Sequence, residues 1–230
     1  MGDTEILREF CAENFTNVPA AIAAGARRIE LCDNLAESGT TPSLGVVEQT
    51  VAYAHENGAR VMCMIRPRGG DFVYSDVELA MMETDIFSAC EAEADGIVFG
   101  CLLGDEQQGY RLDEEACARL MTVAESAADA FELEHLDVTF HMAFDALPPE
   151  AQKPAIDTLA ELGVTRILTH GGVVGTPIMG NIDRLRELTE YAAGRLIILP
   201  GAGITYENVD EVVSGIGAPE AHGTKIVNIR

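Results

Sequence analysis

Short apolar runs alternate along the chain with longer segments in which apolar residues recur at helical spacing. One such pair of segments occupies roughly 25–30 residues, and this repeat is typical of successive β-α units. Strands are predicted at residues 6–12, 28–32, 60–65, 96–99, 137–140, 166–169, 196–199 and 220–222, and helices at 18–24, 44–56, 76–91, 113–130, 149–162, 181–193 and 206–214. Eight similar units favour an α/β fold, a closed (β/α)8 barrel of TIM type, over an open doubly wound sheet, which is the structural alternative.

The length and the end of the chain refine this picture. With 230 residues, 47% of them hydrophobic, the chain has the size of one barrel domain that spans residues 1–230. The sequence stops at Arg230, which leaves no room for a full eighth helix after the last strand. We therefore expect a loop or another subunit to cover the wall between the eighth and first strands, and we predict a homo-oligomer.

Charge and apolar content exclude several classes of partner. The net charge of −23 repels phosphate backbones and anionic membranes, so neither nucleic acid nor a membrane is an expected partner. No apolar run reaches the roughly 18 residues that a membrane-spanning helix needs, and the acidic N-terminus lacks the pattern of a signal peptide. The predicted location is therefore the cytoplasm, where the six cysteines, none of them in a CxxC pair, are expected to stay free thiols.

Strand periodicity predicts which polar residues point into the barrel. Side chains alternate between the two faces of a strand, so one inward residue assigns every second neighbour. If Arg66 points inward, the apolar Val61, Cys63 and Ile65 face outward; the opposite register would place those three inside. Functional groups of barrels collect at the carboxyl ends of the strands, so inward charges there favour a ligand site over a structural Glu30–Arg66 ion pair. The predicted inward set is Glu9, Cys11, Glu13, Glu30, Cys32, Asn34, Met62, Met64, Arg66, Thr139, His141, Ala143 and Asp145.

The segment MIRPRGGDF at residues 64–72 is the strongest single motif. Arg66 and Arg68 are separated by a proline that gives them diverging directions, and guanidinium groups suit phosphate or carboxylate ligands. Asp71 is expected to orient Arg68. A glycine-rich loop, PGAGI at residues 200–204, lies where many barrels bind phosphate through backbone N–H groups. The predicted anion-binding residues are Arg66, Arg68, Asp71, Gly201, Gly203 and His222.

Histidines follow three of the predicted strands. His141 ends the fifth strand and has Asp145 four residues later, an arrangement suited to acid–base chemistry. His170 and His222 end the sixth and eighth strands, and we interpret His170 as a hydrogen-bonded structural residue. The predicted catalytic residues are His141, Glu30, Glu13 and Asp145.

With these motifs in place, the chain resembles the CutC family. RIELC with the loop that follows it and MIRPRGGDF are both specific to that family. The resemblance implies a TIM-type barrel and a cytoplasmic copper-homeostasis protein that binds Cu(I), often through cysteine. Ser38 where the family has glycine, His170 where serine is usual and a short C-terminal tail depart from the pattern. The strings that carry the resemblance cover nearly the whole chain in order: RRIELCDNLAESGTTPSLG (27–45), VMCMIRPRGGDFVYSDVE (61–78), DGIVFG (95–100), VTFHMAFD (138–145), RILTHGG (166–172) and LPGAGI (199–204).

Two functions from different classes stay open. Soft thiolate and thioether ligands select Cu(I), and Cys11 and Cys32, on adjacent strands with methionines on the next, are the predicted copper ligands. The alternative is an isomerase, aldolase or lyase for a small phosphorylated or carboxylated metabolite held by Arg66 and Arg68. A guanidinium repels cations, so the arginine–histidine–carboxylate set fits the enzyme better, whereas the resemblance favours copper homeostasis. A purely structural or partner-binding barrel leaves the inward charges unexplained.

Overall fold

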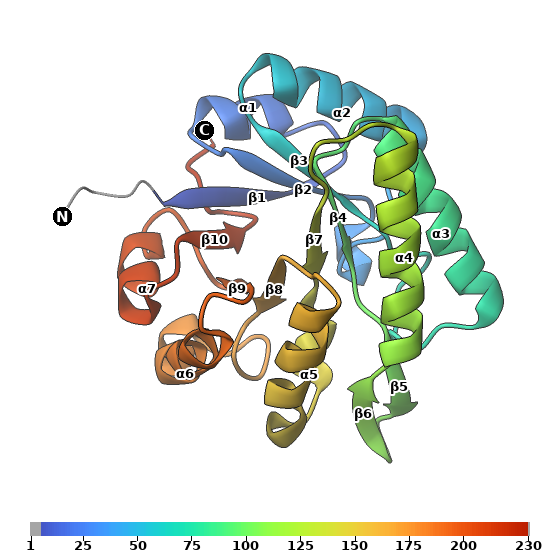
Figure 1. The fold of residues 1–230 in the computed structure, drawn as a ribbon. Helices are drawn as coiled ribbons and strands as arrows, with labels where there is room; N and C mark the ends of the chain where they lie inside the picture. The colour runs from blue at the N-terminus through green and yellow to red at the C-terminus, as the bar shows by residue number, and fades with distance from the viewer. Residues whose placement is uncertain (1–5, 230) are drawn as a thin grey trace.

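Eight parallel strands enclosed by helices form the structure, a computed structural model that describes residues 6–229 (Figure 1). Each barrel strand except the last is followed by a helix that packs on the outside. The barrel strands are β1 (Leu7–Glu13), β2 (Arg28–Cys32), β3 (Arg60–Met64), β4 (Gly96–Phe99), β7 (Asp137–Phe140), β8 (Arg166–Thr169), β9 (Ile197–Pro200) and β10 (Glu220–Gly223). The helices are α1 (Val18–Ala23), α2 (Leu44–Glu56), α3 (Asp76–Glu91), α4 (Glu114–Ala130), α5 (Pro149–Glu161), α6 (Ile182–Ala192) and α7 (Val209–Ile216).

The order of the strands is that of a β/α barrel. Hydrogen bonding joins them as β10-β1-β2-β3-β4-β7-β8-β9, and every neighbouring pair is parallel. β10 is paired with β1, with His222 opposite Glu9. β9 and β10 are neighbours without a ladder between them in residues 6–229, so the barrel is nearly closed. The predicted (β/α)8 fold of TIM type is confirmed.

The segment after β10 packs on the barrel as a loop. Ile226 and Val227 are buried in the main core, and the Tyr206 N–H donates to the Lys225 carbonyl at 2.8 Å. Figure 1 shows this segment leaving β10 and ending near α1. The described residues after β10 therefore pack on the core as a loop, which agrees with the loop alternative, and the homo-oligomer stays a prediction.

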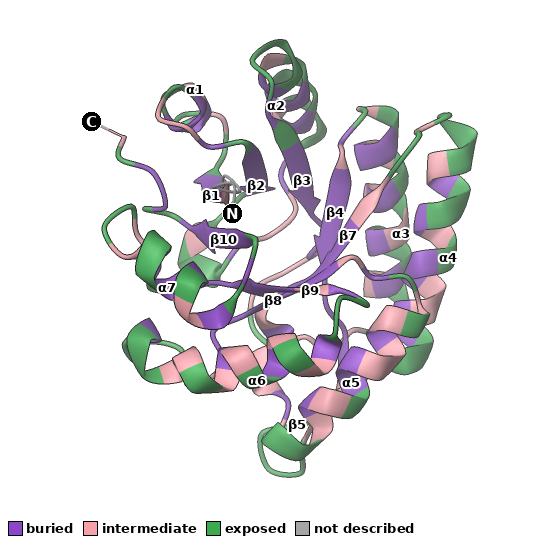
Figure 2. Cartoon of the chain, turned by 60° about the vertical axis from the view of Figure 1, so that its left-hand side comes forward, coloured by how far each residue is buried: buried purple, intermediate pink, exposed green. Residues whose placement is uncertain are grey.

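Two separate apolar clusters confirm the predicted parity of β3. Val61 and Cys63 belong to the main core, which lies between the strands and the helices. Met62 and Met64 point the other way and belong to a small cluster inside the barrel. Figure 2 shows buried residues along the strands and on one face of each surrounding helix. The members of the inner cluster are Cys11, Cys32, Met62, Met64 and Val98.

One element was not predicted from the sequence. β5 (Leu102–Asp105) and β6 (Gly109–Leu112) form an antiparallel hairpin between β4 and α4. In its turn, the Asp105 carboxylate accepts the backbone N–H groups of Gln107 and Gln108, both at 2.8 Å. These strands are four residues each and largely exposed, and the alternation of Tyr110 and Leu112 in β6 is too short to predict a strand by itself.

The last helix begins later than predicted. The Asn208 side chain accepts the Thr205 N–H at 2.8 Å and closes a turn that delays the start of α7 to Val209, not residue 206. By contrast, α3 begins at Asp76 as predicted, because Ser75 and Glu78 form a reciprocal capping box.

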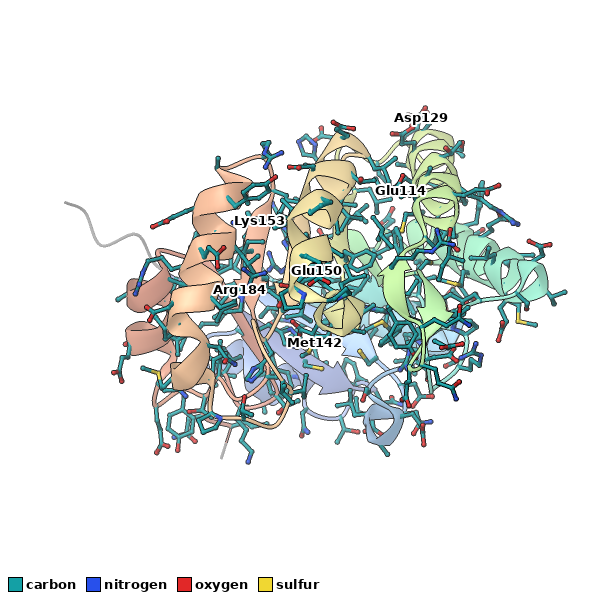
Figure 3. The ribbon with its side chains drawn as sticks, turned by 90° about the horizontal axis from the view of Figure 1, so that it is seen from below. Glu114, Asp129, Met142, Glu150, Lys153 and Arg184 are labelled. Carbon is teal, nitrogen blue, oxygen red and sulfur yellow. The ribbon has the colours of Figure 1, made fainter. Side chains whose placement is uncertain are left out.

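The outer surface carries the acidic charge of the chain. Figure 3 shows Glu114 and Asp129 on α4 and Glu150 on α5 among many charged side chains on the outside of the helices. Basic residues there are paired, as where Lys153 of α5 lies 2.8 Å from Glu187 of α6. Within residues 6–229, no helix combines the length and apolar character that crossing a membrane requires.

Candidate functional site

A cavity of about 610 Å³ opens at the carboxyl ends of the barrel strands. Much of its wall is apolar, including Met142, which the view of Figure 3 shows close to the amino end of α5. Six residues predicted from the sequence as site residues line the cavity together: Cys11, Glu30, Arg66, His141, Asp145 and His222.

At the base of the cavity, a thiol, a carboxyl and an imidazole converge from three adjacent strands. One ligand atom from each of Cys11, Glu30 and His222 lies within 4.8 Å of the other two. Behind them, the Cys32 thiol, which is 1% exposed, donates to Glu30 Oε2 at 3.6 Å. The hydrogen bond from Cys32, helped by His222, outweighs burial and holds the pKa of Cys11 well below its usual value. Burial raises the pKa of Glu30 well above its ordinary value.

One layer closer to the amino ends of the strands, a chain of buried ion pairs fills the barrel. Arg28 contacts Glu9 and lies 2.5 Å from Glu220, which in turn is 3.3 Å from Arg166. Glu9 also accepts from His222 Nδ1 at 2.8 Å and so connects this chain of charges to the cavity. Burial alone raises the pKa of Glu9, but the Arg28 charge and the His222 hydrogen bond outweigh it and bring the pKa to about 2.

Arg66 is held by backbone carbonyls of three loop residues. Its Nη1 donates to Glu37 O at 2.6 Å and to Gly39 O at 2.7 Å, and its Nη2 donates to Gly70 O at 2.7 Å. Its guanidinium also lies 5.0 Å from the centre of the Phe72 ring. The Glu30–Arg66 ion pair considered from the sequence is absent from the described part of the chain. These bonds use three of the five N–H groups of the guanidinium, and Nε has no partner among the described residues.

The structure does not bring Arg68 and Asp71 to the cavity. Arg68 Nη1 donates to Asp71 Oδ1 at 3.0 Å, as expected, while Nη2 donates to Val73 O at 2.7 Å. Its Nε donates to Glu78 Oε1 at 2.5 Å, near the start of α3. Every nitrogen of Arg68 is therefore bound to the protein itself, and the double-arginine clamp expected from the motif is not assembled at the cavity.

His141 and Asp145 both line the cavity, but they do not form the expected pair. The short 3-10 segment Met142–Ala146 directs the Asp145 carboxylate to the end of β8, where it accepts from the Thr169 hydroxyl and, at 2.8 Å, from the His170 N–H. His141 Nδ1 instead accepts the Ala143 N–H at 3.2 Å. Burial, followed by the nearby Arg66 charge, lowers the pKa of His141 to about 3.

The remaining predicted residues lie outside the cavity lining. Glu13 is exposed and accepts the Leu35 N–H at 3.3 Å. Gly201 lies directly against Leu168 and His222, while Gly203 adopts a positive φ beside Ile178. His170 has both ring nitrogens 3.2 Å from partners, Gly201 O and the Thr176 hydroxyl, which confirms its structural interpretation.

Several residues of the site were missed by sequence reasoning. The buried ion pairs of Arg28, Arg166 and Glu220 continue the inward parity by two positions from Glu30, Leu168 and His222. The inward parity of these strands, extended two positions toward their amino ends, is the signal that predicts them. The apolar residues Phe72 and Val173, which line the cavity from loops, carry no periodic signal at all.

Fold and cavity define a (β/α)8 barrel with a buried polar site at its carboxyl mouth. The CutC family model matches residues 6–227, and the chain belongs to the CutC family. A family protein CutC of Enterococcus faecalis is 56% identical over 222 residues, 96% of this chain and 100% of the relative. A human relative named copper homeostasis protein cutC homolog is 41% identical over 220 residues, 94% of this chain and 72% of the relative. A CutC crystal structure from Streptococcus agalactiae superposes with a TM-score of 0.88 at 46% identity, covering 97% of this chain and 100% of the other.

Proposed function

We propose that this chain acts in copper homeostasis by binding Cu(I) through Cys11 and Cys32 at the base of the cavity. The observation that carries the proposal is the sulfur cluster inside the barrel. Two thiols and two thioethers pack together there, separate from the main core. Soft sulfur ligands favour Cu(I) over harder cations. The names of relatives supply the link to copper, and the donor atoms of this chain supply the chemistry.

The donor set fits a monovalent soft ion. Cys11 lies at the surface of the cavity and Cys32 directly behind it, with Met64 against the same loop residue, Gly39, as Cys32. His222 offers an imidazole nitrogen within 4.8 Å of the Cys11 sulfur as a further ligand. A bound Cu(I) would be kept reduced and shielded by this sulfur-rich pocket, while the Arg66 guanidinium stays tied to backbone carbonyls.

Replacement of either cysteine is expected to abolish tight copper binding. Because losing even an outer partner of a metal ligand costs about 10–100-fold in affinity, Cys32→Ala and Cys11→Ala should each weaken Cu(I) binding by more than about 100-fold. The measurement is an anaerobic Cu(I) titration against a competing chromogenic chelator, with folding checked by circular dichroism.

The matched control is Cys63→Ala. Cys63 is equally buried on β3 but faces the main core, so its removal leaves the inner sulfur cluster intact. Its affinity for Cu(I) should equal that of the unmodified chain. Unchanged affinity for Cu(I) in both Cys11→Ala and Cys32→Ala would contradict the copper proposal.

A further inference from the structure

Three buried polar atoms at the cavity have no partner in the protein. Among residues 6–229, five buried side-chain nitrogen or oxygen atoms lack a hydrogen bond, and three of the five belong to residues that line this cavity. These atoms are Glu30 Oε1, Arg66 Nε and His141 Nε2. Each of the three residues is at most 4% exposed. Leaving such groups unpaired is costly, so their concentration around one cavity indicates a ligand that pairs with them.

The proton of His141 is placed by the backbone. Because Nδ1 accepts the Ala143 N–H, a neutral ring carries its hydrogen on Nε2, which becomes a donor. Burial keeps the pKa of His141 near 3, so this donor is present at neutral pH. Gly100 provides the space for the ring, since a Cβ on residue 100 would lie 2.5 Å from both Cε1 and Nδ1.

The second free donor belongs to the neighbouring Arg66. Both terminal nitrogens donate to backbone carbonyls, and its Nε has no partner among the described residues. The Phe72 ring lies 5.0 Å from the Arg66 guanidinium carbon and 4.8 Å from the His141 ring, so it packs against both side chains. Because three carbonyls already accept from Arg66, fewer of its N–H groups remain for a phosphate or carboxylate.

The rest of the lining fits a ligand without net charge. The Arg66 guanidinium shares the cavity with two carboxyl groups, those of Glu30 and Asp145. Most of the other lining residues are apolar, among them Met64 and Leu168. The net charge of −23 also opposes the entry of an anion.

We propose that this cavity binds an uncharged hydroxy-carbonyl compound, with His141 and Arg66 donating to its carbonyl oxygen and Glu30 accepting from one of its hydroxyl groups. Two free N–H donors on side chains that both pack against Phe72 suit a carbonyl oxygen, since paired donors stabilise charge developing on such an oxygen. A cavity of about 610 Å³ has room for a molecule of sugar size. Neither Arg66 nor His141 belongs to the proposed copper ligands, whereas Glu30 lies beside Cys11 and Cys32, so the ketose is tested without copper.

The test uses dihydroxyacetone, D-erythrulose and D-fructose as probes, with glycerol and dihydroxyacetone phosphate as comparators and no copper added. Protein with 15N-labelled histidine is titrated, and the His141 ring signals are followed in long-range 1H–15N spectra. We expect the Nε2–H tautomer before titration, a shift of Nε2 with at least one of the ketoses, and at least tenfold weaker binding of glycerol. The phosphorylated comparator should bind no more tightly than dihydroxyacetone.

Two variants separate a specific contact from general packing. His141→Phe keeps an aromatic ring but removes the donor, and Gly100→Ala pushes the imidazole out of place; both should weaken ketose binding at least tenfold. Gly45→Ala is the control, because a Cβ at residue 45 meets nothing within 4 Å. The proposal is overturned by an Nδ1–H tautomer, by no ketose shifting His141, by tenfold tighter binding of dihydroxyacetone phosphate, or by full affinity in His141→Phe.

Discussion

Replacement of Arg28 by methionine is expected to lower the free energy of unfolding by about 3–5 kcal/mol at neutral pH. Arg28 is 1% exposed and is the shared partner of Glu9 on the adjacent strand β1 and of Glu220 on β10, the strand beyond β1. Without it, two buried carboxylates keep only partial compensation, from His222 and Arg166. Breaking a buried ion pair on one side leaves a charge that the apolar interior does not solvate.

Urea unfolding followed by circular dichroism measures this loss. For a chain of this length the same change corresponds to a fall in Tm of roughly 6–20 °C. Arg60→Met is the matched control: Arg60 is the register partner of Arg28 on β3, but its side chain is 62% exposed and its contact with Asp137 is 3.8 Å long. That variant should change stability by less than about 0.5 kcal/mol. Equal losses in the two variants would contradict a structural role for the buried ion pairs.

Replacement of His141 by glutamine is expected to make the protein more resistant to acid. The pKa of His141 lies near 3 in the folded state, below its ordinary 6.5, so between these values the unfolded chain binds the extra proton. Stability therefore falls as the pH drops from about 6.5 towards 3, with a slope that approaches 1.4 kcal/mol per pH unit, about the value of one proton. In His141→Gln this contribution is missing.

The comparison is made between unfolding free energies at pH 7 and at pH 4.5. Over that interval the variant should lose about 2–3 kcal/mol less than the unmodified chain. His135→Gln, which removes an exposed histidine, should follow the unmodified chain. Parallel curves for the unmodified chain and His141→Gln would show that His141 is not held neutral by burial.

The cavity has two chemically different walls. The sulfur atoms of Cys11 and Cys32 and the imidazole of His222 come from β1, β2 and β10. The free N–H groups of Arg66 and His141 follow β3, which is adjacent to β2, and β7, two strands further along the sheet. A soft cation and a carbonyl oxygen therefore have separate groups to bind, and Glu30 lies next to the sulfur atoms while also offering a free oxygen.

Much of the fold could be predicted because its cause is local. The strands at Arg28–Cys32, Gly96–Phe99, Asp137–Phe140 and Arg166–Thr169 coincide with the predicted ranges, as does the helix Asp76–Glu91. Each is an apolar run or an amphipathic pattern bounded by turn or capping residues. The β5–β6 hairpin escaped prediction because its strands are exposed and are held by their own turn.

The candidate site could likewise be predicted only where its cause is local. Parity along the strands is a property of the sequence, and it correctly placed Cys11, Glu30 and Met64 inside the barrel. The hydrogen-bond partners of a long polar side chain, by contrast, do not follow from the sequence pattern alone. Arg66 donates hydrogen bonds to the carbonyls of Glu37 and Gly39, which lie more than twenty residues earlier in the chain.

The loop Arg66–Asp71 shows why the motif alone overstated an anion site. Two arginines beside glycines offer many donors, but a folded protein first satisfies them with its own buried carbonyls and carboxylates. The sequence by itself therefore determined the barrel, the inward register and the residue types at its mouth, because periodicity and turn chemistry act over a few neighbouring residues. Only the tertiary structure decided which donors stay free, since that depends on loops that meet in space after the chain has folded.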